Sequence, residues 1–171
     1  MRGLEVEASR LTLFAIHPVP VAGGILAISP MPGRSGCYAA DLAEVVEWAP
    51  ALVISMVETA EFAANQVTSF GPDLLRAGID WQHIPVPDFG VPVHLEWPQI
   101  CGNVLARLQS GEHVLIHCMG GCGRSGMIAL RIMIAAGEPV DAALSRLRQA
   151  RPCAIETDAQ MAWAVQDVAP A

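Results

Sequence analysis

The sequence predicts an α/β protein of a single domain, with a central, mostly parallel sheet of about five strands flanked by helices. Five short apolar segments alternate with helical patterns along the chain, which is typical of a sheet covered by helices. Most of these segments are apolar at every position, as expected of strands buried on both faces. A length of 171 residues fits one domain spanning residues 1–171 and allows a sizeable core.

The segments expected to form strands are short and precede turn residues or helices. They are Leu11 to Ile16, Gly24 to Ser29, Leu52 to Val57, Trp81 to Val86 and Glu112 to His117. The expected helices have apolar residues three or four positions apart and span residues 41–48, 98–108, 125–136, 141–150 and 157–168. The helix over 125–136 is apolar nearly all round, so it should be central and buried. Four helices follow residue 97, so one face of the sheet should be heavily helical.

The composition excludes several classes of protein. Hydrophobic residues make up 53% of the chain and charged residues 16%, which argues against intrinsic disorder. The formal net charge is −7 and all ten basic residues are arginines, so we expect no binding to nucleic acid or to an anionic membrane. The start lacks the positive-then-apolar order of a signal peptide, and no apolar stretch approaches the ~20 residues of a membrane span. We expect a cytoplasmic protein, with a monomer favoured.

The stretch VLIHCMGGCGRSGMIAL, residues 114–130, carries the clearest chemical signal. A buried strand runs into His117 and Cys118, a glycine-rich loop follows, and Arg124 and Ser125 open the most apolar helix of the chain. The backbone N–H groups of such a loop and the helix dipole both favour a bound anion. The residues expected to hold a phosphate group are Met119, Gly120, Gly121, Cys122, Gly123 and Arg124.

Three side chains of this stretch suit phosphoryl transfer. The positive surroundings that bind phosphate also favour the thiolate of Cys118, which is a good nucleophile toward phosphorus. The planar guanidinium of Arg124 can hold two phosphoryl oxygens, including as charge builds in the transition state. Ser125 can donate a hydrogen bond to the sulfur when it becomes the leaving group. Taken alone, the cysteine would be a small buried hydrophobic residue and the arginine a solvated charge. The joint pattern, placed between a buried strand and a buried helix, is much more specific for a phosphate site.

The pattern resembles the signature HCx5R(S/T) of the cysteine-dependent protein tyrosine phosphatase superfamily, and it reads HCMGGCGRS at residues 117–125. The chain is most similar to the dual-specificity group, in particular to its kinase-associated phosphatase branch. Three more stretches resemble family segments: ISPMPG (28–33), HIPVPDFGVP (83–92) and RPCAIETDAQ (151–160). The resemblance extends from about residue 25 to about residue 165. It implies a phosphatase in which His117 orients the loop and supports the thiolate.

Asp88 is the candidate general acid and base. Expelling an alkoxide or phenolate requires a proton donor, and the same group can later deprotonate the attacking water. The proline-rich segment 85–92 carries a single carboxylate, since Asp88 is the only acid between Asp80 and Glu96. The resemblance identifies this segment as the general-acid loop. Taken alone, Asp88 would be a turn residue before an aromatic residue and a glycine.

Residues 153–160 are expected to steady the site. Thr157 and Gln160 have the spacing of a capping box at a helix start. The resemblance implies that Gln160 also helps to place the hydrolytic water, with purely structural work as the alternative, and that Glu156 or Thr157 steadies the neighbouring loop. Cys153 stands where the family usually has glycine. It either changes a backbone conformation that needs a positive φ or places a second thiol near the site.

Five cysteines, an odd number without a regular framework, fit a reducing compartment with free thiols. Cys122 lies inside the loop, four residues after Cys118, and could trap the oxidised nucleophile as a reversible disulfide. The strain of a disulfide across so tight a loop argues against that pairing. Cys101 and Cys153 are further candidates, so redox control is a hypothesis without a preferred partner.

Neither a metal nor another cofactor is expected. His83, His94 and His113 lie at unrelated points of the chain, and no HExxH or paired CxxC motif occurs. The five residues between Cys118 and Arg124 carry no charge. This argues against a polyphosphorylated inositide and favours phosphotyrosine or phosphoserine/threonine on a protein or peptide.

The expected function is therefore hydrolysis of phosphate monoesters through a cysteinyl-phosphate intermediate on Cys118. A rhodanese-like sulfurtransferase and a catalytically idle phosphate-binding module are the alternatives, and the retention of Arg124 and Asp88 argues against both. The letters GRSG also occur at residues 33–36, but Ile28 rather than a cysteine lies six residues before Arg34. This earlier copy is predicted to form a turn before a helix.

Overall fold

A computed structural model describes residues 14–167 of the chain and confirms the predicted α/β architecture. One five-stranded sheet has the strand order β1-β2-β5-β3-β4. The first pair, β1 with β2, is antiparallel and the remaining pairs are parallel. The strands are β1 (His17–Val21), β2 (Gly24–Ser29), β3 (Leu52–Ser55), β4 (Asp80–His83) and β5 (His113–His117).

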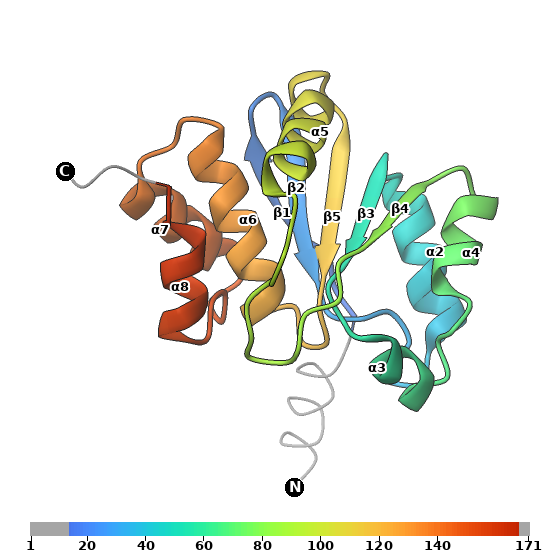
Figure 1. Cartoon of the computed structure of the whole chain (residues 1–171). Coiled ribbons are helices and arrows are strands. Elements are labelled where there is room, and N and C mark those ends of the chain that lie inside the picture. Colours follow the sequence, from blue (N-terminus) through green and yellow to red (C-terminus); the bar gives the residue numbers. More distant parts are fainter. Residues whose placement is uncertain (1–13, 168–171) are drawn as a thin grey trace, which may run out of the picture.

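Helices cover both faces of the sheet (Figure 1). One face carries α2 (Tyr38–Trp48), α3 (Thr59–Ala64) and α4 (Phe70–Arg76). The other carries α5 (Trp97–Gln109), α6 (Gly123–Ala135), α7 (Val140–Ala150) and α8 (Asp158–Ala164), so the heavily helical face is confirmed. The five predicted helices are all present, but α8 ends at Ala164, before the predicted end at residue 168, which lies outside the described residues. The sequence did not predict α3 and α4, which have 6 and 7 residues and are too short for a clear helical period.

The central strands are buried on both faces, which explains why they are apolar at every position. In β5, Val114 and Ile116 contribute to the cluster beneath α5–α8, and Leu115 contributes to the cluster beneath α2–α4. Successive side chains of a strand point to opposite faces, so a strand between two helical layers needs apolar residues throughout. The helix α6 is buried along most of its length, as predicted.

The predicted strand over Leu11 to Ile16 is wrong where it can be compared. Residues 14–16 form no strand, and residues 11–13 lie outside the described residues. The first strand instead has the sequence HPVPV and begins at His17. Its two prolines hid it from the sequence analysis, because proline cannot donate to a strand ladder. β1 is an edge strand of the sheet, where a missing N–H is tolerated.

The fold brings the predicted chemical segments to one edge of the sheet. The strands β2, β3, β4 and β5 are parallel, so their carboxyl ends share this edge. The loop from β5 to α6 and the loop from β4 to α5 both lie there (Figure 1). Ligands of open α/β sheets bind at such an edge. Among the described residues, no helix combines the length and the apolar character that crossing a membrane requires.

Candidate active site

The loop between β5 and α6 turns its carbonyl groups away from its centre. The carbonyl oxygens of Gly120 and Gly121 accept hydrogen bonds from Nη2 and Nε of Arg151 at 2.8 and 3.1 Å. In a trans peptide the N–H points opposite to the carbonyl, so the N–H groups of Gly121 and Cys122 face the other way. Neither donates a hydrogen bond to another described residue. The loop therefore presents free backbone donors, as an anion site requires.

Arg124 closes the loop and is 1% exposed. Its Nη1 donates to Glu61 at 2.7 Å and to the carbonyl oxygen of Val86 at 2.9 Å, and its Nη2 donates to the second carboxylate oxygen of Glu61 at 2.9 Å. The Nε atom is buried and has no partner among the described residues. A buried unpaired donor is costly, so Nε is available to an anion such as a phosphoryl oxygen.

Charge holds Arg124 in its protonated form. Burial alone would lower the pKa of the guanidinium, but the hydrogen bonds that it donates to Glu61 and the negative charges of Cys118, Glu61 and Asp88 outweigh burial and raise it. Nη2 also lies 3.3 Å from a carboxylate oxygen of Asp88. The predicted acid and the predicted phosphate-binding arginine therefore meet, although Asp88 and Arg124 are far apart in the sequence.

Glu61 is a site residue that the sequence analysis missed. It lies on α3, where its side chain accepts from the backbone N–H of Glu58 at 2.7 Å in a capping box. Burial raises the pKa of Glu61, but the hydrogen bonds from Arg124 and Glu58 and the charge of Arg124 more than reverse this and lower it. The spacing Glu58-x-x-Glu61 is the signal that could have located the start of α3.

Cys118 and Ser125 are adjacent, as the loop pattern predicts. The sulfur of Cys118 lies 3.3 Å from the hydroxyl oxygen of Ser125. Cys118 is 3% exposed and is a free thiol, and Ser125 is fully buried. A hydroxyl at this distance can donate to a thiolate, which is the role that the sequence analysis gave to Ser125.

His117 is buried in a polar chain that begins outside the predicted site. The indole N–H of Trp81 donates to the hydroxyl oxygen of Ser55 at 2.8 Å, and this oxygen lies 2.6 Å from Nε2 of His117. The Nδ1 atom is 3.4 Å from the carbonyl oxygen of Cys118, which can only accept. These roles are satisfied together when Nδ1 carries the proton and Ser55 donates to Nε2. Complete burial lowers the pKa of His117 to about 4, so the ring is neutral at physiological pH.

Segment 85–92, called the acid loop below, approaches the loop of residues 118–123 between β5 and α6, called the phosphate loop, and contacts Arg124 through Val86 and Asp88. Asp88 is largely exposed, and one of its carboxylate oxygens accepts from the N–H of Phe89 at 3.1 Å. Phe89 adopts a left-handed backbone conformation with φ 61°. The carbonyl oxygen of Gly90 accepts from Nε2 of Gln160 at 3.3 Å. The loop is therefore fastened beside Asp88 to the start of α8, while the carboxylate itself stays accessible.

Gln160 is fully buried and makes hydrogen bonds at the start of α8. Its side-chain oxygen accepts from the backbone N–H groups of Glu156 and Thr157 at 3.0 and 3.2 Å. The backbone N–H of Gln160 donates to the Thr157 hydroxyl. The predicted capping box is thus confirmed. Glu156 accepts from the N–H of Gly123 at 3.1 Å, so this segment also contacts the phosphate loop.

The two unusual cysteines are joined to each other. Cys122 and Cys153 form a disulfide with their Cα atoms 5.1 Å apart. The suggested pairing of Cys122 with Cys118 is therefore not found, and Cys101 is a buried free thiol. Cys153 is not among the residues with positive φ, so it places a second sulfur near the site rather than altering a left-handed turn.

The earlier GRSG also contacts the site. Gly33 and Gly36 have φ values of 84° and 86°, and the N–H of Gly33 donates to Asp41 of α2 at 2.8 Å, so the predicted turn is confirmed. Arg34 extends from this turn and donates to the carbonyl oxygen of Met119 at 3.3 Å. This contact between Arg34 and Met119 was not predicted from the sequence.

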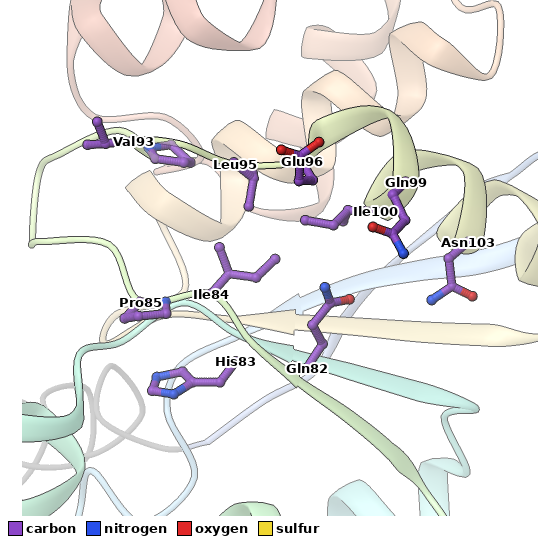
Figure 2. A pocket seen from close by; sticks show the side chains of 11 residues that line it. Gln82, His83, Ile84, Pro85, Val93, Leu95, Glu96, Gln99, Ile100 and Asn103 are labelled. Carbon is purple, nitrogen blue, oxygen red and sulfur yellow. The ribbon is translucent and has the colours of Figure 1, made fainter.

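A cavity of about 500 Å³ lies beside the acid loop (Figure 2). It lies between β4 and α5, and Figure 2 shows the amide side chains of Gln82, Gln99 and Asn103 on its walls. No residue from 117 to 125 lines it, so it is distinct from the phosphate loop. Within residues 14–167, no group of three or more His, Cys, Asp or Glu side chains is arranged to hold a metal ion.

A free thiol, a loop with free N–H groups and a buried arginine thus meet at one edge of an α/β sheet, and comparison with known families identifies the class of protein. The family described as "Polymorphic toxin system, DSP-PTPase phosphatase" matches residues 31–138, and the chain belongs to this family. Cyclin-dependent kinase inhibitor 3 of Sus scrofa is 35% identical over 86 residues, which cover 47% of this chain. The match spans 41% of the length of that relative.

Solved structures agree with this assignment. The chain is 30% identical to Tk-PTP in its active form, with a TM-score of 0.69, and the match covers 88% of this chain and 95% of that one. A structure of kinase associated phosphatase, with its catalytic-site cysteine replaced by serine, has a TM-score of 0.76 at 20% identity. That match covers 90% of this chain and 93% of the other, and it supports the fold.

Proposed function

We propose that the chain is a protein phosphatase that hydrolyses phosphate monoesters of phosphotyrosine or phosphoserine/threonine, with residues 1–171 acting as one catalytic domain. The observation that carries the proposal is the buried, unpaired Nε of Arg124 at the start of α6. The loop that precedes Arg124 has free N–H groups and begins with the free thiol of Cys118. A phosphoryl group between these donors would satisfy all of them. It would also lie within reach of Asp88, given the ion pair between Asp88 and Arg124.

The first chemical step transfers the phosphoryl group to the enzyme. The thiolate of Cys118 attacks phosphorus, the bond from phosphorus to the ester oxygen breaks, and Asp88 donates its proton to the departing oxygen. Arg124 and the loop N–H groups stabilise the charge on the equatorial oxygens. Glu61 holds the guanidinium from its outer side, so the remaining donors keep a fixed direction.

The second step releases phosphate. A water molecule attacks phosphorus and gives a proton to the carboxylate of Asp88, and the bond between phosphorus and sulfur breaks. Ser125, 3.3 Å from the sulfur, donates to the thiolate that is regenerated. Gln160 joins the acid loop to α8 through Gly90, and we assign to it a part in placing this water.

The substrate assignment rests on the loop composition and on the family. The residues between Cys118 and Arg124 carry no charge that would meet the extra phosphates of an inositide. A phosphorylated protein or peptide is therefore the proposed substrate. The Arg124 geometry and the position of Asp88 favour this function over a sulfurtransferase or an idle binding module.

The proposal is tested by hydrolysis of para-nitrophenyl phosphate. Cys118→Ser and Arg124→Ala should lose nearly all turnover, whereas Cys37→Ser, at an exposed free cysteine, provides the matched control and should stay active. Asp88→Ala should be impaired most on phosphoserine, whose leaving group is poor. Wild-type turnover by Cys118→Ser would rule out the covalent mechanism. Full activity of Asp88→Ala on phosphoserine would overturn the acid assignment.

A further inference from the structure

The disulfide between Cys122 and Cys153 crosslinks the phosphate loop to the segment that precedes α8. The two residues are 31 positions apart, and neither is the proposed nucleophile. Cys118 remains a free thiol beside the bonded pair. The bond can therefore form and break without consuming the group that attacks phosphorus.

The crosslink lies where the phosphate loop is fastened to the rest of the protein. Arg151 donates to the carbonyl oxygens of Gly120 and Gly121. The N–H of Ile155 donates to the carbonyl oxygen of Cys122 at 3.2 Å. Three successive loop carbonyls are thus held by residues 151–155. The disulfide adds a covalent connection between the same two segments.

These attachments fix the direction of the loop N–H groups. A peptide whose carbonyl is held outward by Arg151 or Ile155 must direct its N–H the other way. Gly120, Gly121 and Gly123 give the loop backbone unusual freedom, and Gly121 has φ 66°. A covalent connection at Cys122 limits the conformations that this glycine-rich loop can adopt before an anion binds.

We propose that Cys122 and Cys153 form a reversible thiol–disulfide couple whose oxidised form preorganises the phosphate loop and increases its affinity for phosphate esters. Reduction breaks the S–S bond, two protons and two electrons come from an external dithiol, and that dithiol becomes a disulfide. Both cysteines are half-buried, so a small dithiol has access. The ligand named here rests on the proposed phosphatase function.

The test uses a Cys37→Ser/Cys118→Ser double variant, in which the exposed thiol and the nucleophile are both removed. Cys122 and Cys153 are set to the disulfide or dithiol state and verified by alkylation and mass spectrometry. Calorimetry then measures the dissociation constant of para-nitrophenyl phosphate in each state. We expect binding to be roughly threefold to tenfold weaker in the dithiol state, because the loop must be ordered on binding.

Two further variants in the same background control the measurement. Adding Cys153→Ser should give the weaker affinity at every redox setting, whereas adding Cys101→Ser, at a buried free cysteine, should leave the redox response intact. Amide hydrogen exchange over residues 118–126 should be slower in the disulfide state, whether or not ligand is present.

Equal affinity and equal exchange in the two states would overturn the proposed couple. Persistent hydrolysis by the wild type in both states would then leave the phosphatase assignment standing. Absence of hydrolysis in both states would instead refute the phosphatase assignment, while the exchange measurement would still report on the crosslink. The two failures are therefore distinguishable.

Discussion

Glu61 holds Arg124 through two hydrogen bonds, one from each terminal nitrogen of the guanidinium, at 2.7 and 2.9 Å. The carboxylate approaches from α3, while Cys118 and the loop N–H groups belong to the segment between β5 and α6. This arrangement occupies the outer donors of Arg124 and leaves Nε unpaired. The glutamate therefore determines which donors the arginine can offer to a phosphoryl group.

Replacing Glu61 with Gln should impair the site and the fold together. The buried guanidinium would lose its ion pair, at a cost of about 2 kcal/mol, less than the ~3–5 kcal/mol of a fully buried pair because Glu61 is partly exposed. Misdirection of Arg124 should reduce kcat/KM by roughly tenfold to a hundredfold. Chemical denaturation and para-nitrophenyl phosphate kinetics measure the two effects.

Glu58→Gln is the control for this prediction, since Glu58 caps the same helix without contacting Arg124. It should retain a kcat/KM close to that of the wild type. Equal losses in both variants would show that α3 stability, rather than the contact with Arg124, matters for turnover.

Burial of neutral His117 should make the protein less stable in acid. The folded-state pKa is about 4, below the ordinary value of 6.5, so the unfolded chain binds a proton that the folded chain does not bind between these values. The stabilisation is complete above pH 6.5 and is lost as the pH falls toward 4, by about 3 kcal/mol in total. Urea denaturation across this range should show the loss.

The contribution of His117 is isolated by comparing His117→Asn with the wild type. In the variant, the free energy of unfolding should depend less steeply on pH. The difference in slope should correspond to the uptake of up to about one proton on unfolding. His94→Asn, at an exposed histidine, should keep the wild-type slope. Identical slopes for His117→Asn and the wild type would contradict the buried neutral state.

Two neighbouring glycines of the phosphate loop should respond differently to alanine. A Cβ atom at Gly121 would lie 2.5 Å from the backbone of Ser29, at a position with φ 66°. A Cβ at Gly120 would meet nothing nearer than 3.4 Å, at the flexible end of Arg34. Gly121→Ala should therefore destabilise the fold by about 2 kcal/mol, the sum of left-handed strain and a backbone clash.

Gly120→Ala is the matched control and should change the stability by no more than about 0.5 kcal/mol. Thermal unfolding of the two variants tests the difference. If both substitutions were tolerated equally, the loop would not pack against β2 as described.

Gln160→Ala should destabilise the start of α8 and slow the second chemical step. The partly buried N–H groups of Glu156 and Thr157 would lose their acceptor, which costs about 1–3 kcal/mol for the two hydrogen bonds together. If Gln160 also places the hydrolytic water, the cysteinyl-phosphate should accumulate, giving a burst of para-nitrophenol before steady turnover. Rapid-mixing kinetics detects the burst.

Gln166→Ala, at an exposed glutamine just after α8, is the control and should show neither effect. A destabilised Gln160→Ala with no burst would limit Gln160 to structural work.

The chemical core of the site was predictable because it is local in sequence. His117, Cys118, Arg124 and Ser125 lie within nine consecutive residues, and a strand, a glycine loop and a helix start suffice to bring them together. The position of Asp88 beside Arg124 was expected, because the resemblance points to segment 85–92 and that segment has a single acid. The apolar periodicity of the central strands and longer helices likewise reveals which faces are buried.

Contacts between distant segments were not predictable from the sequence. Local sequence patterns do not relate several contacting residues to the site. These residues are Glu61, which binds Arg124, Trp81 and Ser55, which form a hydrogen-bonded chain with His117, and Arg151, which binds the loop carbonyls. The strand β1 was missed because two prolines conceal an edge strand, and α3 and α4 because they are short.

The sequence by itself determined the candidate nucleophile, the glycine-rich loop that follows it and the α/β class, because each depends on neighbouring residues and on apolar periodicity. The tertiary structure decided how that loop is held: Glu61 directs Arg124, Arg151 turns two carbonyls outward, and Cys153 bonds to Cys122. These contacts join residues 30 or more positions apart, and chain folding alone brings them within reach.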